Sequence, residues 1–179
     1  MNANNETLYY FEPLGNQHNR APFSCGVEGL DSYFQGDPIR QDVSRKTTNA
    51  FVLTSDSESV VGFYTLSASS ILSVDLPARL QKKLPKRPIG TTLIGRMGIV
   101  KSLQGKHLGE RLLYDAFYKA WQASKFVSSW AVIVDSKDGA REFYIRYGFT
   151  PFYTQPNRLF LLMKNIDLMF EQTIPGPNE

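Results

Sequence analysis

The residues with the clearest chemical potential surround two glycines, Gly105 and Gly109, in the stretch RMGIVKSLQGKHLGERLL at 96–113. A β-prone segment precedes these glycines and a strongly amphipathic helical pattern follows them. The first N–H groups of a helix lack partners within the helix, and the helix dipole adds positive charge there. Such a turn favours a phosphate or pyrophosphate. An ordinary tight connection between a strand and a helix remains the alternative interpretation.

The stretch matches neither the nucleotide P-loop nor the dinucleotide-binding pattern G-x-G-x-x-G. The chain as a whole offers no Ser-His-Asp combination, and it holds only two histidines and one cysteine, Cys25. A lone Cys25 is typical of a small buried residue rather than of a nucleophile. We predict no metal site.

These residues need a scaffold, and the hydrophobic pattern predicts strands before, between and after helices. Strands are expected at about 7–12, 48–54, 60–72, 91–100, 126–134, 149–154 and 159–163, and helices twice within 27–46 and at about 75–84, 106–124 and 138–147, with one more after 163. Such alternation predicts an α/β or α+β fold with a mixed sheet covered by helices. The glycine-containing turn then joins the strand at 91–100 to the main helix.

Length and composition limit the class of protein. The chain has 179 residues, 42% of them apolar, with 20 Lys+Arg against 17 Asp+Glu. These values predict one globular domain over 1–179 with a short polar tail at 173–179, and they exclude collagen-like, fibrous and disordered chains. The sequence offers no secretory signal and no apolar run of about 20 residues, so we expect a cytoplasmic protein without membrane contact.

Two motifs resemble the GNAT acetyltransferase superfamily. The pyrophosphate loop of that family, Gln/Arg-x-x-Gly-x-Gly/Ala, aligns with QGKHLG at 104–109, although His107 stands where the family usually has glycine. The segment AREFYIRYGF at 140–149 looks like the family's helix-to-strand segment, in which Tyr144 would lie beside the sulfur of coenzyme A. The resemblance implies the GNAT fold, a mixed, mostly antiparallel sheet of about six to seven strands flanked by helices.

The resemblance also implies acetyl-CoA as the cofactor and Tyr144 as the catalytic residue. The expected cofactor contacts come from the strand end, the loop and the segment after the next strand: Met97, Gly98, Ile99, Val100, Gln104, Gly105, Lys106, His107, Leu108, Gly109, Ser136 and Lys137.

A narrower resemblance covers most of the chain. The segments FSCGVEGLDSYF at 23–34, VVGFYTLSA at 60–68 and the loop together look like the GNAT toxins of type II toxin–antitoxin systems. Those toxins acetylate the amino group of aminoacyl-tRNA and so stop translation. The resemblance implies a cognate antitoxin protein and a homodimer as partners.

Acetyl transfer to an amine needs a neutral nucleophile, a site for the oxyanion and a proton for the departing thiolate. An α-amino group has a pKa near 7.7–8.0, so no strong base is required. Backbone N–H groups of the strand at 97–100 can hold the oxyanion. Tyr144, with an ordinary pKa near 10, can donate to the thiolate.

Basic residues form two groups that would contact RNA phosphates. They are Arg40, Arg45 and Lys46 in the first group, and Arg79, Lys82, Lys83, Lys86 and Arg87 in the second. A solvated basic face is the alternative interpretation. Two other functions stay open: a GNAT enzyme acting on a small amine or a protein N-terminus, and a non-catalytic module that only binds acetyl-CoA.

Overall fold

The structure is a computed structural model that describes residues 7–137 and 139–171. The contacts of the chain group it into two compact units: residues 7–65 with 96–115 form unit 1, and the described residues of 66–95 and 116–171 form unit 2. The predicted polar tail at 173–179 lies outside the described residues, and the single domain over 1–179 stays a prediction. Within the described ranges, no helix is long and apolar enough to span a membrane.

Seven strands form one mixed sheet, as the sequence predicts. They are β1 (Tyr10–Pro13), β2 (Asn49–Thr54), β3 (Val60–Ile71), β4 (Ile89–Ile99), β5 (Ala131–Asp135), β6 (Thr150–Pro151) and β7 (Arg158–Leu162), in the order β1-β2-β3-β4-β5-β7-β6. β1 pairs antiparallel with β2, β5 with β7, and β6 with β7, whereas β4 pairs parallel with β5. The α/β class with a mostly antiparallel sheet is therefore confirmed.

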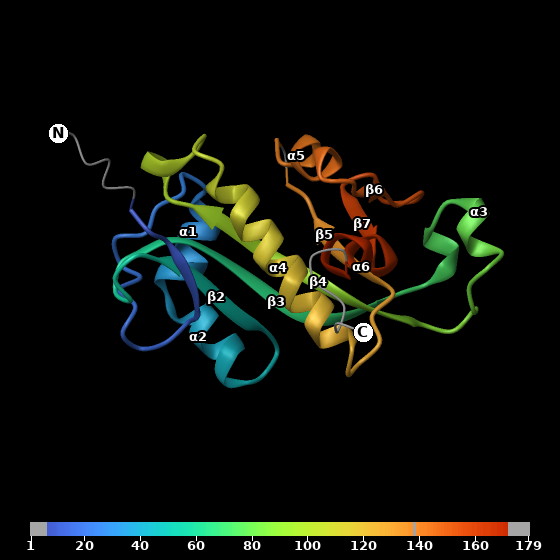
Figure 1. Cartoon of the computed structure of the whole chain (residues 1–179), viewed down its shortest axis with the longest axis horizontal. Coiled ribbons are helices and arrows are strands. Elements are labelled where there is room, and N and C mark those ends of the chain that lie inside the picture. The colour runs from blue at the N-terminus through green and yellow to red at the C-terminus, as the bar shows by residue number, and fades with distance from the viewer. Residues whose placement is uncertain (1–6, 138, 172–179) are drawn as a thin grey trace, which may run out of the picture. The chain divides into compact units, whose positions relative to one another are not determined.

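In unit 1, two short helices cover a strongly aromatic core. α1 (Glu28–Gln35) and α2 (Asp37–Ser44) follow one another beside β2 (Figure 1). Gly36 separates them in an extended conformation, and Pro38 sits in the first turn of α2, where its missing N–H costs nothing. The Phe34 ring stacks on Phe63 at 4.2 Å between ring centroids, and Phe23 packs against both rings. The prediction of two helices within 27–46 is confirmed.

The main helix, α4 (Leu108–Ser124), has the predicted apolar face. Every residue of that face is buried: Leu108, Leu112, Leu113, Ala116, Phe117, Ala120 and Trp121. The helix begins at Leu108, two residues later than expected, because His107 has a φ of 60° and is not helical. Between β4 and α4 lies the short 3-10 helix η2 (Lys101–Leu103).

Unit 2 has its own hydrophobic core on the second part of the sheet. Its helical elements are η1 (Ser73–Asp75), α3 (Ala78–Gln81), α5 (Arg141–Arg146) and α6 (Met163–Glu171). Ile133 of β5, Phe160 of β7 and Phe152 pack together in its core. α6 packs on β5 and β7.

Three predicted boundaries in unit 2 were wrong. The strand expected from residue 126 begins only at Ala131, because the N–H groups of Phe126 and Val127 donate to the Ala123 carbonyl and finish the end of α4. The helix expected at 75–84 is reduced to α3, because Pro77 holds Leu76 in an extended conformation. The strand expected at 149–154 is only the two-residue β6.

Candidate active site

The predicted pyrophosphate loop leads from β4 to α4 within unit 1. At the end of β4, Gly98 packs beside Phe63 and Cys25, where an added Cβ would make only ordinary contacts, 3.4 Å from the Phe63 ring. Gly105 then adopts a φ of 76°, a left-handed conformation that glycine takes without a steric penalty. The backbone therefore requires glycine for the turn at Gly105.

The backbone donors of this loop are available to a ligand. Within the described part of the chain, none of the N–H groups of residues 105–110 donates a hydrogen bond to a protein acceptor. They stand at the first turn of α4, a helix of 17 residues, where the dipole favours an anion. This geometry suits an anion, and binding of a pyrophosphate at the loop stays a prediction.

A side-chain clamp holds the loop in place. The Gln104 amide nitrogen donates to the carbonyls of Cys25, at 2.8 Å, and of Ile99, at 3.1 Å. These two bonds tie the loop to the end of β4 and to the segment at 23–26. Gln104, predicted as a cofactor contact, is in this structure a residue that positions the loop.

The FSCG segment at 23–26 forms the other half of the clamp. Asp31 of α1 accepts hydrogen bonds from the Cys25 N–H, at 2.7 Å, and from the Ser24 hydroxyl, at 2.9 Å. The Ser24 carbonyl accepts the N–H of Lys101 at 2.9 Å. Cys25 is buried, as predicted, and burial raises the pKa of its thiol to about 11. Sequence reasoning assigned this segment no chemistry, and its sequence holds no signal for a contact with residue 104.

The other predicted contacts of the loop differ in exposure. The side chains of Lys106 and His107 are exposed, and the His107 ring lies 3.4 Å from Glu110. The Leu108 side chain is buried in the core, so only the backbone of this residue can contact a ligand at the loop. The Val100 N–H donates to the Val61 carbonyl at 2.9 Å, which removes it as an oxyanion donor. Oxyanion binding by Met97, Gly98 and Ile99 stays a prediction.

The left-handed conformation of His107 explains why glycine suits this position. A residue with a Cβ pays about 1 kcal/mol or more in that region, and His107 has a φ of 60°. We expect His107→Gly to raise the free energy of unfolding by up to about 1 kcal/mol and to preserve acetyl-CoA binding. Urea unfolding with His107→Ala as control measures this, because alanine keeps the penalty. A His107→Gly protein less stable than His107→Ala would contradict the explanation.

Tyr144 lies in unit 2, on the helix α5. Its ring sits between the Phe143 and Phe149 rings at centroid distances of 5.2 and 5.5 Å. Gly148, with a φ of 91°, turns the chain back so that the Phe149 N–H donates to the Tyr144 carbonyl. The aromatic residues of this motif therefore fix the direction of the Tyr144 ring.

The Tyr144 hydroxyl is a protonated and available donor. Burial raises the pKa of Tyr144 to about 12, so the phenol keeps its proton at neutral pH. Among residues 7–137 and 139–171, none is hydrogen-bonded to this hydroxyl. The group can donate to a developing anion and cannot act as a base.

The remaining predicted residues are placed as follows. Ser136 is buried, and both its N–H and its hydroxyl donate to the Asn157 carbonyl at 2.8 Å. Lys137 is exposed. Both cofactor contacts stay predictions. All eight predicted RNA-binding residues are exposed, with Arg40, Arg45 and Lys46 in unit 1 and the group at 79–87 in unit 2.

No family model matches the chain. It is 34% identical over 144 residues to a tRNA-acetylating toxin of Mycobacterium tuberculosis, which covers 80% of this chain and 85% of the relative. The structure of AtaT complexed with acetyl-methionyl-tRNAfMet is 31% identical, with a TM-score of 0.83 over 90% of this chain and 99% of that chain. A variant of AtaT bound to the C-terminus of the antitoxin AtaR and acetyl-CoA is 27% identical, with a TM-score of 0.78 over 90% and 98%.

The fold and the loop at 104–109 define an acetyltransferase of the GNAT type. Within that class, the chain belongs to the family of tRNA-acetylating toxins.

Proposed function

We propose that this chain transfers the acetyl group of acetyl-CoA to the α-amino group of an aminoacyl-tRNA and thereby blocks translation. The observation that carries the proposal is the clamped loop at 104–109, with unpartnered backbone donors at the start of α4. Membership of the toxin family and the AtaT complexes with acetyl-methionyl-tRNA and with acetyl-CoA support the substrate and the cofactor.

In the proposed reaction, the loop, the end of β4 and Tyr144 each have one role. The neutral amine attacks the thioester carbonyl carbon, a C–N bond forms and the C–S bond breaks. The amine loses one proton and the departing sulfur gains one. In the proposal, the loop N–H groups bind the pyrophosphate of acetyl-CoA, backbone N–H groups at 97–99 hold the oxyanion, and Tyr144 donates to the thiolate.

The partners and the location follow from the same proposal. Because the proposed substrate is a tRNA, we also propose a cytoplasmic location. The antitoxin complex of AtaT supports a cognate antitoxin for this chain. We also propose a homodimer and one acetyltransferase domain over the whole chain. Sedimentation at two protein concentrations tests the dimer.

The test of the function is transfer of labelled acetyl from acetyl-CoA to a charged tRNA pool. Deacylated tRNA, polyamines and a short peptide with a free N-terminus serve as parallel acceptors for the wild type and for Tyr144→Phe. Label on charged tRNA alone, lost in the variant, is expected. Label on polyamines or on a peptide N-terminus would replace the proposal by a small-amine or N-terminal acetyltransferase. Binding of acetyl-CoA without any transfer would identify a non-catalytic module.

The pH profile of transfer depends on the ionisation of two groups, the α-amino group of the substrate and the Tyr144 phenol. The α-amino group must be neutral, so the rate rises with pH through about 7.7–8.0. Tyr144 must be protonated, and its pKa of about 12 keeps it so far above that range. We expect kcat/KM to rise and then stay level up to about pH 10. A falling limb between about pH 8 and 10 that Tyr144→Phe abolishes would contradict the assigned protonation state.

A further inference from the structure

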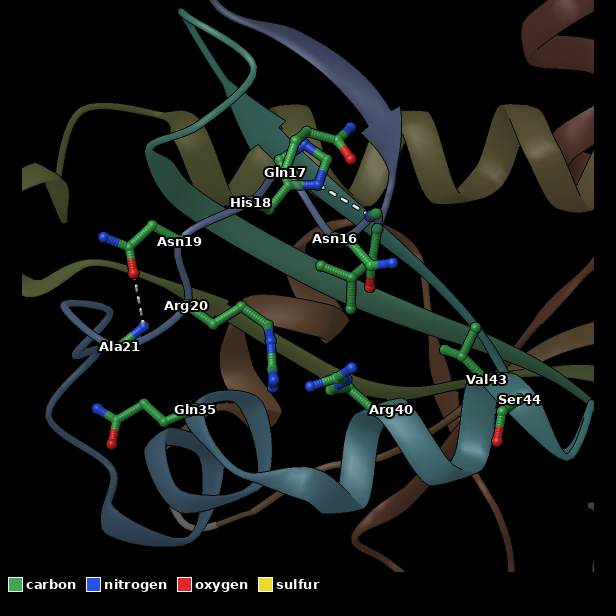
Figure 2. A pocket seen from close by; sticks show the side chains of 12 residues that line it. Asn16, Gln17, His18, Asn19, Arg20, Ala21, Gln35, Arg40, Val43 and Ser44 are labelled. Carbon is green, nitrogen blue, oxygen red and sulfur yellow. Dashed lines mark hydrogen bonds between the residues drawn. The ribbon is translucent and has the colours of Figure 1, made fainter.

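A polar pocket of about 720 Å³ lies in unit 1, open to solvent and separate from the loop at 104–109. The segment at 14–21 forms one wall, and the end of α1 and the helix α2 form the other (Figure 2). Two arginines, Arg20 and Arg40, line it, and no Asp or Glu does. Amide side chains make up much of the remaining lining: Asn16, Gln17, Asn19 and Gln35. The pocket therefore offers many hydrogen-bond donors and two positive charges.

The Arg20 guanidinium is held rigidly at the junction of α1 and α2. One of its nitrogens donates to the Phe34 carbonyl and, at 2.6 Å, to the Gly36 carbonyl. Both acceptors are neutral, so the positive charge of Arg20 is not neutralised by these bonds. Figure 2 shows that Arg20 extends from the loop wall into the pocket.

Arg40 approaches from the opposite wall. It extends from α2 into the pocket (Figure 2) and makes no hydrogen bond or ion pair with any residue that the structure describes. The charge of Arg40 also lowers the pKa of Arg20, next to the larger effect of burial, while Asp37 opposes both. Two guanidinium groups close enough to repel each other form a site that an anion would stabilise.

The imidazole of His18, which also lines the pocket, is not available to a ligand. Its Nδ1 accepts the Gly15 N–H at 2.9 Å, and its Nε2 pairs with Glu12 at 3.0 Å. Both nitrogens serve to shape the loop wall. Gln35 donates to the Phe23 carbonyl, and Gln17 is hydrogen-bonded to Glu12. The donors left for a ligand are therefore Arg40, the other N–H groups of Arg20 and the Asn16 and Asn19 amide nitrogens.

We propose that this pocket is a phosphate subsite that holds a backbone phosphate of the tRNA. The inference rests on the proposed function, which makes a polyanion the substrate. Arginine forms forked hydrogen bonds with phosphate, and Asn and Gln side chains commonly bind phosphate and sugar oxygens. The pocket is open rather than enclosed, as a chain passing through it requires. Its described lining holds no Phe, Tyr or Trp, and the side chain of His18 is fully buried, so no ring is open for a base to stack on. The backbone is therefore the part of the RNA that the pocket holds.

The test is the salt dependence of tRNA binding by the full chain. In Arg40→Gln we expect the dissociation constant of deacylated tRNA to rise about tenfold at low salt. The slope of log K against log salt should fall by about 1, as for loss of one phosphate contact. Lys164→Gln is the control for loss of one positive charge, because Lys164 is an exposed residue of α6 that neither lines the pocket nor belongs to the predicted RNA-binding groups. Its effect should be clearly smaller.

A second measurement observes the pocket directly. The Nε–H resonances of Arg20 and Arg40 are followed by NMR during titration with inorganic phosphate and with a single-stranded trinucleotide. Both resonances should shift, and the trinucleotide should act at the lower concentration. Shifts with phosphate alone would make the pocket a site for a small free anion and overturn the RNA assignment.

The outcomes separate this inference from the proposed function. If the wild type acetylates charged tRNA while Arg40→Gln and Lys164→Gln weaken binding equally, the pocket proposal is wrong and the function stands. Unshifted arginine resonances would likewise refute the pocket alone. If the wild type acetylates no charged tRNA, the function fails, and the trinucleotide titration still decides whether the pocket binds RNA.

Discussion

Tyr144→Phe is expected to slow acetyl transfer to charged tRNA about a hundredfold or more, with little change in acetyl-CoA affinity. The substitution removes one hydroxyl and keeps the ring between Phe143 and Phe149. Removal of one positioned hydrogen-bond donor to a developing negative charge slows a reaction about 10²- to 10³-fold, and the loss appears in kcat. Expression without antitoxin should then no longer arrest growth.

The raised pKa of Tyr144 bears on whether the phenol transfers its proton to the sulfur or only donates a hydrogen bond to it. A thiol has a pKa near 8.5, about 3.5 units below the pKa of about 12 of Tyr144. Complete proton transfer from the phenol to the thiolate would therefore cost about 5 kcal/mol. We infer that Tyr144 stabilises the departing sulfur by a hydrogen bond, while the amine supplies the proton that the product thiol finally carries.

The control for this prediction is Tyr153→Phe, which removes a hydroxyl from an exposed tyrosine of unit 2. It should keep the full rate and the full toxicity. A fully toxic Tyr144→Phe protein would contradict the mechanism. Loss of toxicity together with loss of acetyl-CoA binding would instead indicate a structural role for the hydroxyl.

Gln104→Glu is expected to raise the dissociation constant of acetyl-CoA about 10- to 30-fold. The carboxylate has nearly the same shape as the amide but lacks its N–H donors. It would face the carbonyl oxygens of Cys25 and Ile99, which now accept at 2.8 and 3.1 Å. Loss of two hydrogen bonds of about 1 kcal/mol each accounts for the size of the effect.

Two further variants separate the clamp from the added charge. Gln104→Met removes the donors without adding a charge and should weaken binding by a similar factor. Gln122→Glu adds the same charge on the exposed side of α4, where Gln122 donates to the Tyr118 hydroxyl, and should change acetyl-CoA affinity little. Calorimetric titration measures all three proteins. Unchanged affinity in Gln104→Met would refute the positioning role.

The sequence predicted the main elements because their patterns are local. The apolar face of α4 repeats every three to four residues, and all seven residues assigned to it are buried. Gly36 and Pro38 marked the division between α1 and α2 through their own backbone preferences. The failures were boundaries that depend on backbone hydrogen bonds, as at Phe126 and Val127, whose apolar side chains suggested a strand although both are exposed.

For this protein, the sequence alone determined the class of chemistry, through the loop at 104–109 and the motif around Tyr144. Only the tertiary structure decided how those residues work. The clamp joins Gln104 to Cys25 across 79 positions of the chain, and the pocket joins Arg20 to Arg40 from two walls. Such contacts depend on packing between distant segments. A short motif encodes the residue types of a site. The distant residues that position a site residue, or that lie beside it and add a second charge, are brought together only by the fold.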